Sequence, residues 1–229
     1  MIKINTVYDY KSLKRVDSPN GRVYVDSNGN KLPSVTTILG KTKPAEDRKA
    51  LQEWKARVGH QEATKITKEA SNVGTIMHNI LENWILGNDT EHGSNLIYTT
   101  AKTMAEVIKS NIKDDISEVW GSEVHLYYPD LYAGTTDLVG IWKGKPTIMD
   151  FKQTNKPKKR EYVHDYFLQL SAYAEAHDTL FNTNIDQAVI FMCSREGEFQ
   201  QFEIIGSDFE HWKEQWANRI TKYYNMNGI

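Results

Sequence analysis

Hydrophobic residues change their spacing along the chain, and this change separates a helical first part from a strand-rich centre. Apolar positions three or four residues apart predict helices over about 45–87, with a well-formed helix over about 71–86, and again over about 96–117. Earlier in the chain, residues 22–26 alternate and predict a strand in a hairpin. The β-branched run 35–39 predicts either a strand that pairs with it or the approach to a helix.

The centre of the sequence has the period of two that is typical of strands. Alternation over 123–128, 133–142 and 147–152, interrupted by glycines, predicts three consecutive antiparallel strands. The elements predicted to follow are a helix over about 162–180, strands over 187–194 and 199–204, and a last helix that opens with a capping box at Ser207. This order predicts one α/β or α+β domain with a mixed sheet.

Composition and charge exclude several classes of protein. With 28 basic and 30 acidic residues among 229, the formal charge is −2, which excludes a globally basic coat for nucleic acid but not a local basic track. The single Cys193 excludes an intrachain disulfide framework, a zinc ribbon and a four-thiolate iron–sulfur cluster. No apolar run approaches the roughly 20 residues of a membrane span, and no transit peptide is visible, so we expect a soluble, cytoplasmic protein.

Two acidic residues and one lysine in the predicted meander carry the strongest chemical signal. Asp137 ends the sequence G-T-T-D, and Asp150 and Lys152 lie in I-M-D-F-K. Residues two apart on a strand share a face, and a hairpin would bring Asp137 beside the other two. Two carboxylates suit Mg²⁺ or Mn²⁺, and a lysine there can orient or deprotonate a water during phosphodiester hydrolysis. The alternative is a solvated strand surface.

Two helical pairs are candidate partners of these residues. His78 and Glu82 lie one turn apart, so the histidine can supply a third metal ligand, and Glu82 can orient it or bind a metal-bound water. Gln169 and Tyr173 are also one turn apart, on the helix that follows the D-x-K strand, and both can hydrogen-bond a phosphate or the lysine. Each pair alone is equally consistent with an ordinary half-buried helix surface.

Basic residues gather in two places. Residues 151–160 carry no acidic side chain and five basic ones, namely Lys152, Lys156, Lys158, Lys159 and Arg160. A second set surrounds Trp54 in the first helical region, namely Lys41, Lys43, Arg48, Lys49, Lys55 and Arg57. Cations next to an aromatic ring are typical of single-strand binding, whereas the alternatives are a solvated loop and a buried tryptophan.

The order of these motifs resembles a known family. G-x-x-x-H-x-x-x-E, an acidic Glu123, G-x-x-D, D-x-K and Q-x-x-x-Y follow one another as in the RecB-like exonuclease branch of the PD-(D/E)XK nuclease superfamily. The likeness is strongest to the mitochondrial genome maintenance exonucleases and their phage relatives. It extends to PSVTTIL at 33–39, LQEWKARVG at 51–59 and AYAEAHD at 172–178.

The resemblance implies both a fold and a site. The fold would be an α/β restriction-endonuclease-like core, a central mixed β-sheet flanked by helices, in one nuclease domain over 1–229. Its N-terminal strand and a helical arch over single-stranded DNA would occupy about 1–95, and the core about 96–229. The residues implied as metal ligands are His78, Asp137, Asp150 and the carbonyl of Phe151. Lys152 would be the catalytic lysine, Gln169 and Tyr173 would steady the site, and Glu123 would hold a metal-bound water.

We therefore predict a Mg²⁺- or Mn²⁺-dependent DNA exonuclease without an iron–sulfur cluster, which acts on single-stranded DNA or DNA ends and leaves 5′-phosphates. The DNA contacts would come from Lys55, Arg57, Trp54, Lys156, Lys158, Lys159 and Arg160. The literal Pro129-Asp130 is not expected to be the ligand, because this branch uses the aspartate of G-x-x-D. No P-loop is present, so a helicase or recombination protein would be a separate partner in a bacterial or phage setting.

Two alternatives remain open at this point. The same site would also suit a structure-specific DNA endonuclease, and a non-catalytic DNA-binding module of recombination would share the basic tracks. An aspartate-based phosphatase lacks its D-x-D-x-T motif, and a serine hydrolase lacks its G-x-S-x-G turn.

Overall fold

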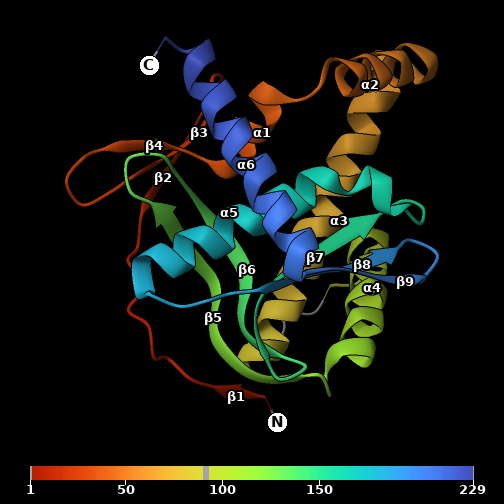
Figure 1. Ribbon diagram of the computed structural model, residues 1–229. Coiled ribbons are helices and arrows are strands. Elements are labelled where there is room, and N and C mark those ends of the chain that lie inside the picture. Colours follow the sequence, from red (N-terminus) through yellow and green to blue (C-terminus); the bar gives the residue numbers. More distant parts are fainter. Residues whose placement is uncertain (1, 90–92, 229) are drawn as a thin grey trace.

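A six-stranded mixed sheet forms the centre of the molecule and has helices on both faces (Figure 1). The computed structural model describes residues 2–89 and 93–228. In spatial order the strands are β1 (Lys3–Ile4), β5 (Ile116–Tyr128), β6 (Tyr132–Trp142), β7 (Lys145–Thr154), β8 (Gln187–Ser194) and β9 (Phe199–Ile205). The pairs β1–β5 and β7–β8 are parallel and the others antiparallel. The predicted mixed α/β fold with a central sheet flanked by helices is confirmed.

Both faces of this sheet are buried. On β7, Ile148 packs into one hydrophobic cluster and the next residue, Met149, into another on the opposite side. The first cluster contains residues of α5 (His164–Phe181) and α6 (Gly206–Met226), and the second contains residues of α3 (His60–Leu86) and α4 (Leu96–Ile112). Every residue of β8 is buried, as expected for a strand covered on both faces.

A small second sheet adjoins β6. Its three antiparallel strands are β2 (Lys14–Ser18), β3 (Gly21–Val25) and β4 (Lys31–Pro33). The hydroxyls of Tyr24 and Thr135 lie 3.0 Å apart, and Ser34 forms a parallel bridge with Ala133. These contacts attach the small sheet to the end of β6 that also carries the predicted G-x-x-D motif.

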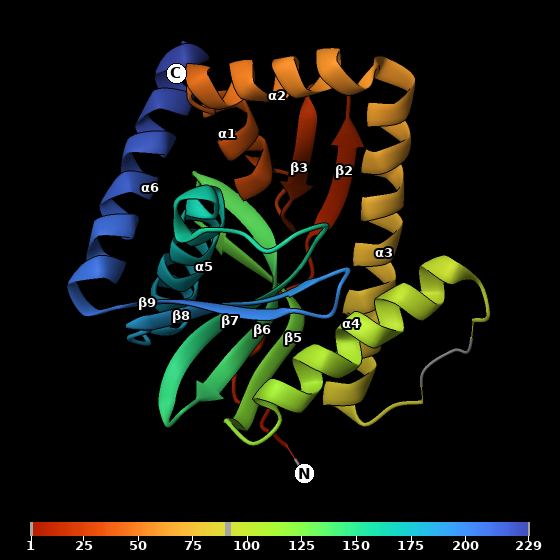
Figure 2. The same cartoon turned by 90° about the vertical axis from the view of Figure 1, so that its right-hand side faces the viewer.

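Two short helices lead from the small sheet to α3. They are α1 (Val35–Thr42) and α2 (Ala45–Val58), and Figure 2 shows α2 lying across the ends of α1 and α3, with β2 and β3 inside this frame. Of the two predictions for the run 35–39, the helical one is confirmed, because the Ser34 side chain accepts the Thr37 N–H and caps α1. All 14 residues of α2 are described and none is buried.

Four boundaries differ from the predictions. The first meander strand begins at Ile116 rather than 123, because register shifts between Ile116 and Glu118 and between Val119 and Gly121 hide the alternation. The helix predicted over about 96–117 ends at Ile112, and residues 116 and 117 belong to β5 instead. The predicted capping box at Ser207 is wrong, because α6 begins one residue earlier with no side-chain cap. The predicted helix over about 71–86 begins earlier, at the first residue of α3.

Within the described ranges, no helix combines the length and the apolar character that crossing a membrane requires.

Candidate active site

The strands β6 and β7 separate at the predicted site. Their pairing continues up to Leu138 opposite Met149 and stops there, while β7 continues alongside β8. Beyond this point the backbone of Phe151 is bonded to side chains. Its N–H donates to Asp137 Oδ2 at 2.8 Å, and its carbonyl accepts from His78 Nε2 at 2.7 Å. Two predicted site residues therefore replace a strand–strand hydrogen-bond pair.

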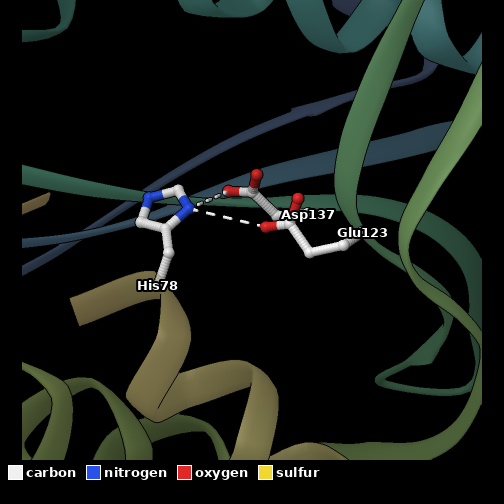
Figure 3. A group of neighbouring side chains, drawn as sticks. All are labelled: His78, Glu123 and Asp137. Carbon is white, nitrogen blue, oxygen red and sulfur yellow. Dashed lines mark ion pairs between the residues drawn. The ribbon is translucent and has the colours of Figure 1, made fainter. Parts of the chain in front are cut away.

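Three side chains from three elements face one another here (Figure 3). His78 of α3 has its Nδ1 atom 3.5 Å from Asp137 Oδ2 of β6 and 3.9 Å from Glu123 Oε1 of β5. One potential ligand atom from each of the three lies within 4.8 Å of the others. Because Nε2 of His78 donates to a backbone carbonyl, the ring is oriented and Nδ1 is the nitrogen that faces the carboxylates.

Asp150 and Lys152 form an ion pair beside this group, as their shared strand face predicts. Asp150 is buried, and the ammonium of Lys152 contacts its carboxylate. Apart from this ammonium, neither oxygen of Asp150 has a hydrogen-bond partner among the described residues. The Lys152 ammonium also lies 5.1 Å from the centre of the Tyr166 ring, on the α5 side of the sheet.

The charges of the site shift one another. Burial would lower the pKa of His78, but the facing carboxylates of Asp137 and Glu123 outweigh it and raise this pKa to about 10. Burial and the neighbouring Asp137 raise the pKa of Asp150. Burial would lower the pKa of Lys152, yet the two aspartates raise it, so the lysine is an ammonium ion at neutral pH. The site holds more acidic than basic groups in a small volume.

Glu82 adds to this excess of negative charge. Burial is the largest cause of its raised pKa, and the nearby carboxylates of Glu123 and Asp137 add to it. The structure gives Glu82 no hydrogen bond to His78 within the described residues. The expected orientation of His78 comes instead from the carbonyl of Phe151.

The donor set fits a hard divalent cation. Carboxylate oxygens and one imidazole are ligands that Mg²⁺ and Mn²⁺ accept. The buried carboxylate of Asp150 has the Lys152 ammonium as its ion-pair partner, and the nearby carboxylate of Asp137 still leaves excess negative charge that a cation would offset. The residues that could hold the ion are His78, Glu123, Asp137 and Asp150. The Phe151 carbonyl, implied as a further ligand, here accepts the Nε2–H of His78, on the other side of the ring from Nδ1.

The predicted Gln169–Tyr173 pair lies at the same place. Gln169 Nε2 donates to Tyr173 Oη at 3.2 Å. Both side chains line a cavity of about 260 Å³, together with His78, Glu123, Asp137 and Lys152. Tyr173 approaches β6 closely because Gly134 has no side chain there, and a Cβ atom at that position would lie 2.5 Å from the Tyr173 ring.

The predicted DNA-binding residues lie apart from this cavity. Lys55 and Arg57 are exposed on α2, and Trp54 is partly buried there. In the segment after β7, Lys156 is exposed, while Lys158 uses its backbone N–H and C=O to bond the side chain of Gln200.

Two further cations of that segment have acidic partners. Arg160 pairs with Asp208 at 2.5 Å and lies over the ring of Phe167. Lys159 lies 4.0 Å from Glu161. Arg160 is thus held against α5 and α6, whereas Lys156 and Lys159 extend toward solvent.

Sequence reasoning missed one side of the cavity. Five residues of the small sheet and of the first turn of α1 complete its lining, namely Arg15, Arg22, Tyr24, Ser34 and Thr36. The last two lie in the PSVTTIL segment, which the family resemblance marks. The sequence did not mark the two arginines as site residues, because they lie on polar strands that look like ordinary solvent-exposed ones.

Comparison with known proteins finds relatives in three organisms that all carry the same name. Mitochondrial genome maintenance exonuclease 1 of Xenopus tropicalis is 28% identical over 208 residues, which cover 86% of this chain and 58% of that protein. The human protein of that name is 25% identical over 228 residues, which cover 92% of this chain and 64% of that protein. The chain is related to these exonucleases. The mouse protein is 26% identical over 219 residues, which cover 90% of this chain and 63% of that protein.

The match has limits in length and in structure. The chain spans about three fifths of the length of these curated relatives. No family model matches it. A solved structure of a candidate exonuclease from Eubacterium rectale aligns with a TM-score of 0.49 at 15% identity, over 69% of this chain and 68% of that one.

Proposed function

We propose that this chain is a divalent-metal-dependent exonuclease that hydrolyses phosphodiester bonds of single-stranded DNA or DNA ends. The observation that carries the proposal is one cavity lined by His78, Glu123, Asp137 and Lys152, with the buried Asp150 paired to the lysine. The relatives, which are named as exonucleases, support this activity. Removal of single-stranded ends serves replication, recombination and repair of DNA alike.

In this proposal Mg²⁺ or Mn²⁺ would be held by His78, Glu123, Asp137 and Asp150. The Phe151 carbonyl would orient the histidine by accepting its Nε2–H. A bound divalent cation supplies Lewis acidity and makes a water more acidic. The His78 ring would contribute Nδ1, because its Nε2–H is directed at the carbonyl, and binding of the ion would release the Nδ1 proton. Glu123 is the most exposed of the three clustered groups, so it would be the ligand nearest to solvent.

Lys152 has an electrostatic role. Its raised pKa keeps it an ammonium ion, so it orients the attacking water and offsets negative charge on the phosphoryl oxygens. Asp150 holds the ammonium in place through the ion pair. Gln169 and Tyr173 donate hydrogen bonds at the far wall of the cavity and fix the phosphate relative to Lys152.

The substrate strand would be held by groups outside the cavity. Lys55, Arg57 and Trp54 of α2 provide cations and an aromatic ring, a combination that suits single strands. Lys156, Lys158, Lys159 and Arg160 continue the track from the end of β7. The exposed surface of α2 supports such contacts, since none of its side chains is committed to a core.

The test is digestion of end-labelled linear single-stranded, duplex and circular single-stranded DNA with Mg²⁺, Mn²⁺ or EDTA. We expect stepwise shortening of linear single strands with either metal, no cleavage in EDTA, and intact circles. Cleavage of the circles would identify an endonuclease with the same site. Binding of DNA without cleavage under any condition would contradict the enzymatic proposal.

Two variants assign the activity to this site. Asp150→Asn and Lys152→Met should each lower the cleavage rate by roughly 100-fold or more, because they remove a ligand and the charge opposite the phosphate. Lys145→Met, at the start of the same strand, is the matched control, because Lys145 is exposed and outside the cavity. Full activity of either site variant would disprove the proposed roles.

A further inference from the structure

A pair of arginines on the small sheet faces the candidate active site. Arg15 of β2 is paired with Tyr24 of β3, and Asp17 is paired with Arg22, so these four residues lie on one face of the small sheet. Arg15, Arg22 and Tyr24 line the same cavity as His78, Asp137 and Lys152. The small sheet thus brings two permanent cations to a cavity whose opposite wall is acidic.

Asp17 holds both guanidinium groups through one nitrogen each. Its two carboxylate oxygens accept from Arg15 Nε and from Arg22 Nε, both at 2.8 Å. Within residues 2–89 and 93–228, the Nη atoms of both arginines have no hydrogen-bond partner. One aspartate and two arginines leave a net charge of +1. Asp17 therefore holds both guanidinium groups in place through Nε, and their Nη–H groups remain available to a hydrogen-bond acceptor.

The ligand that suits such forks is a phosphate. Guanidinium groups bind phosphate oxygens in a bidentate way and cannot bind a metal ion. The hydroxyl-bearing Thr36 lines the cavity next to them, and the first turn of α1 contains no acidic residue that would repel an anion. Arg22 and Arg15 remain partly accessible, with 33% and 50% of their side chains exposed.

We propose that Arg15 and Arg22 form a second phosphate subsite, which holds the phosphate adjacent to the scissile one in the same nucleic-acid strand. This inference rests on the proposed function, because the scissile phosphate is assigned to the metal ligands and Lys152. Two phosphates held at once fix the register of the strand against the reacting groups. The arginines are binding residues that position the strand and do not touch the reacting atoms.

The test is a chemical double-mutant cycle on binding. The probe is a labelled oligothymidylate in which one phosphate at a time is replaced by a neutral methylphosphonate. Binding is measured for an Asp137→Asn/Asp150→Asn protein, in which cleavage is blocked and no metal is needed to screen the acidic groups. At one phosphate position, or at two neighbouring ones, the neutral link should weaken binding about tenfold.

In a protein that also carries Arg22→Gln or Arg15→Gln, the same methylphosphonate should weaken binding only slightly, because the arginine that binds that phosphate is already absent. Each arginine variant should also reduce the slope of log affinity against log salt by about one. Lys14→Gln is the matched control, since Lys14 is the neighbour of Arg15 on β2 and points to the opposite face. Its effect should add to that of every methylphosphonate.

The outcomes separate this inference from the proposed function. Additive effects of Arg22→Gln and of the methylphosphonate at all positions, with normal binding of the unmodified probe, would overturn the subsite and leave the nuclease proposal intact. Failure of the unmodified probe to bind would overturn both. If Arg22→Gln does not fold, Arg22→Lys takes its place: it keeps the charge but not the fork, and should lose part of the coupling.

Discussion

The carboxylate of Asp137 accepts the backbone N–H of Phe151, so a side chain of β6 holds the backbone of β7 where the two strands have stopped pairing. The same carboxylate faces His78. Asp137 therefore serves both the sheet and the candidate metal site. The two roles can be separated, because an amide oxygen can accept the Phe151 N–H but carries no negative charge for a metal ion.

Asp137→Asn should keep the fold and lose metal binding. The asparagine oxygen can still accept the Phe151 N–H, but the neutral amide is a poor ligand for a hard cation. In the wild type, saturating Mn²⁺ should raise Tm by several degrees, since about 2.7 kcal/mol is gained at 100 times Kd. The variant should lose most of this rise in a thermal-shift measurement. Asp130→Asn, on an exposed turn, should respond like the wild type.

Glu123→Gly should weaken metal binding without weakening the fold. Glu123 has a φ of 51°, a left-handed conformation that costs a side-chain-bearing residue about 1 kcal/mol or more. Glycine removes this strain and adds freedom to the unfolded chain, so the free energy of unfolding should stay the same or rise by up to about 1 kcal/mol.

The measurement for this variant is urea unfolding together with the Mn²⁺-dependent rise in Tm. Asp130→Gly is a matched control, because Asp130 has a φ of 63° and lies outside the cavity. Its free energy of unfolding in urea should change as that of Glu123→Gly does, and it should keep the full Mn²⁺-dependent rise in Tm. An unchanged response to Mn²⁺ in Glu123→Gly would remove Glu123 from the ligand set.

Gly134→Ala should destabilise the protein and slow cleavage. The new methyl group would lie 2.5 Å from the Tyr173 ring and 2.9 Å from its hydroxyl, so the ring and its Gln169 partner must move. Overpacking of this kind costs about 1–3 kcal/mol. Gly40→Ala in α1 is the control: it has no neighbour within 4 Å of the new Cβ atom and should be neutral or slightly stabilising. Equal stabilities for both variants would contradict the close-packing explanation.

Glu175→Gln should change how stability depends on pH. Burial is the main cause that raises the pKa of Glu175 from 4.5 to about 7. Between these values the unfolded chain releases the proton while the folded protein keeps it, so stability falls as pH rises through this window. The glutamine variant avoids this loss and should be about 1–2 kcal/mol more stable at pH 8, after allowance for partial exposure.

Denaturant unfolding at pH 4 and pH 8 checks this prediction. At pH 4 the glutamate is protonated in both states, and the two proteins should then have similar stabilities. Equal stabilities at pH 8 as well would show that the Glu175 carboxyl is solvated in the folded protein.

The parts of the site on regular strands could be predicted from the sequence. Alternation places Asp150 and Lys152 on one face of β7, and the structure pairs them. A helical spacing of four likewise predicted the Gln169–Tyr173 contact. These relationships are local, because the backbone period alone decides which side chains point the same way.

Relationships that depend on distant packing could not be predicted. The positive φ of Glu123 directs its side chain toward His78, and it follows two register shifts that alternation does not reveal. The strand β2 is exposed along its whole length, so Arg15 resembles a surface residue until the small sheet is docked against β6. Val35–Leu39 resembles a strand by composition, and the cap at Ser34 decides for a helix.

The helix α2 joins α1 to α3 across the top of the molecule in Figure 2, although none of its side chains is anchored in a core. Its opening would therefore break few buried contacts, and hydrogen exchange along it should be far faster than along β8. If the strand of the proposed function runs beneath α2, local fraying of this segment can admit it while the central sheet and the groups on it stay in register.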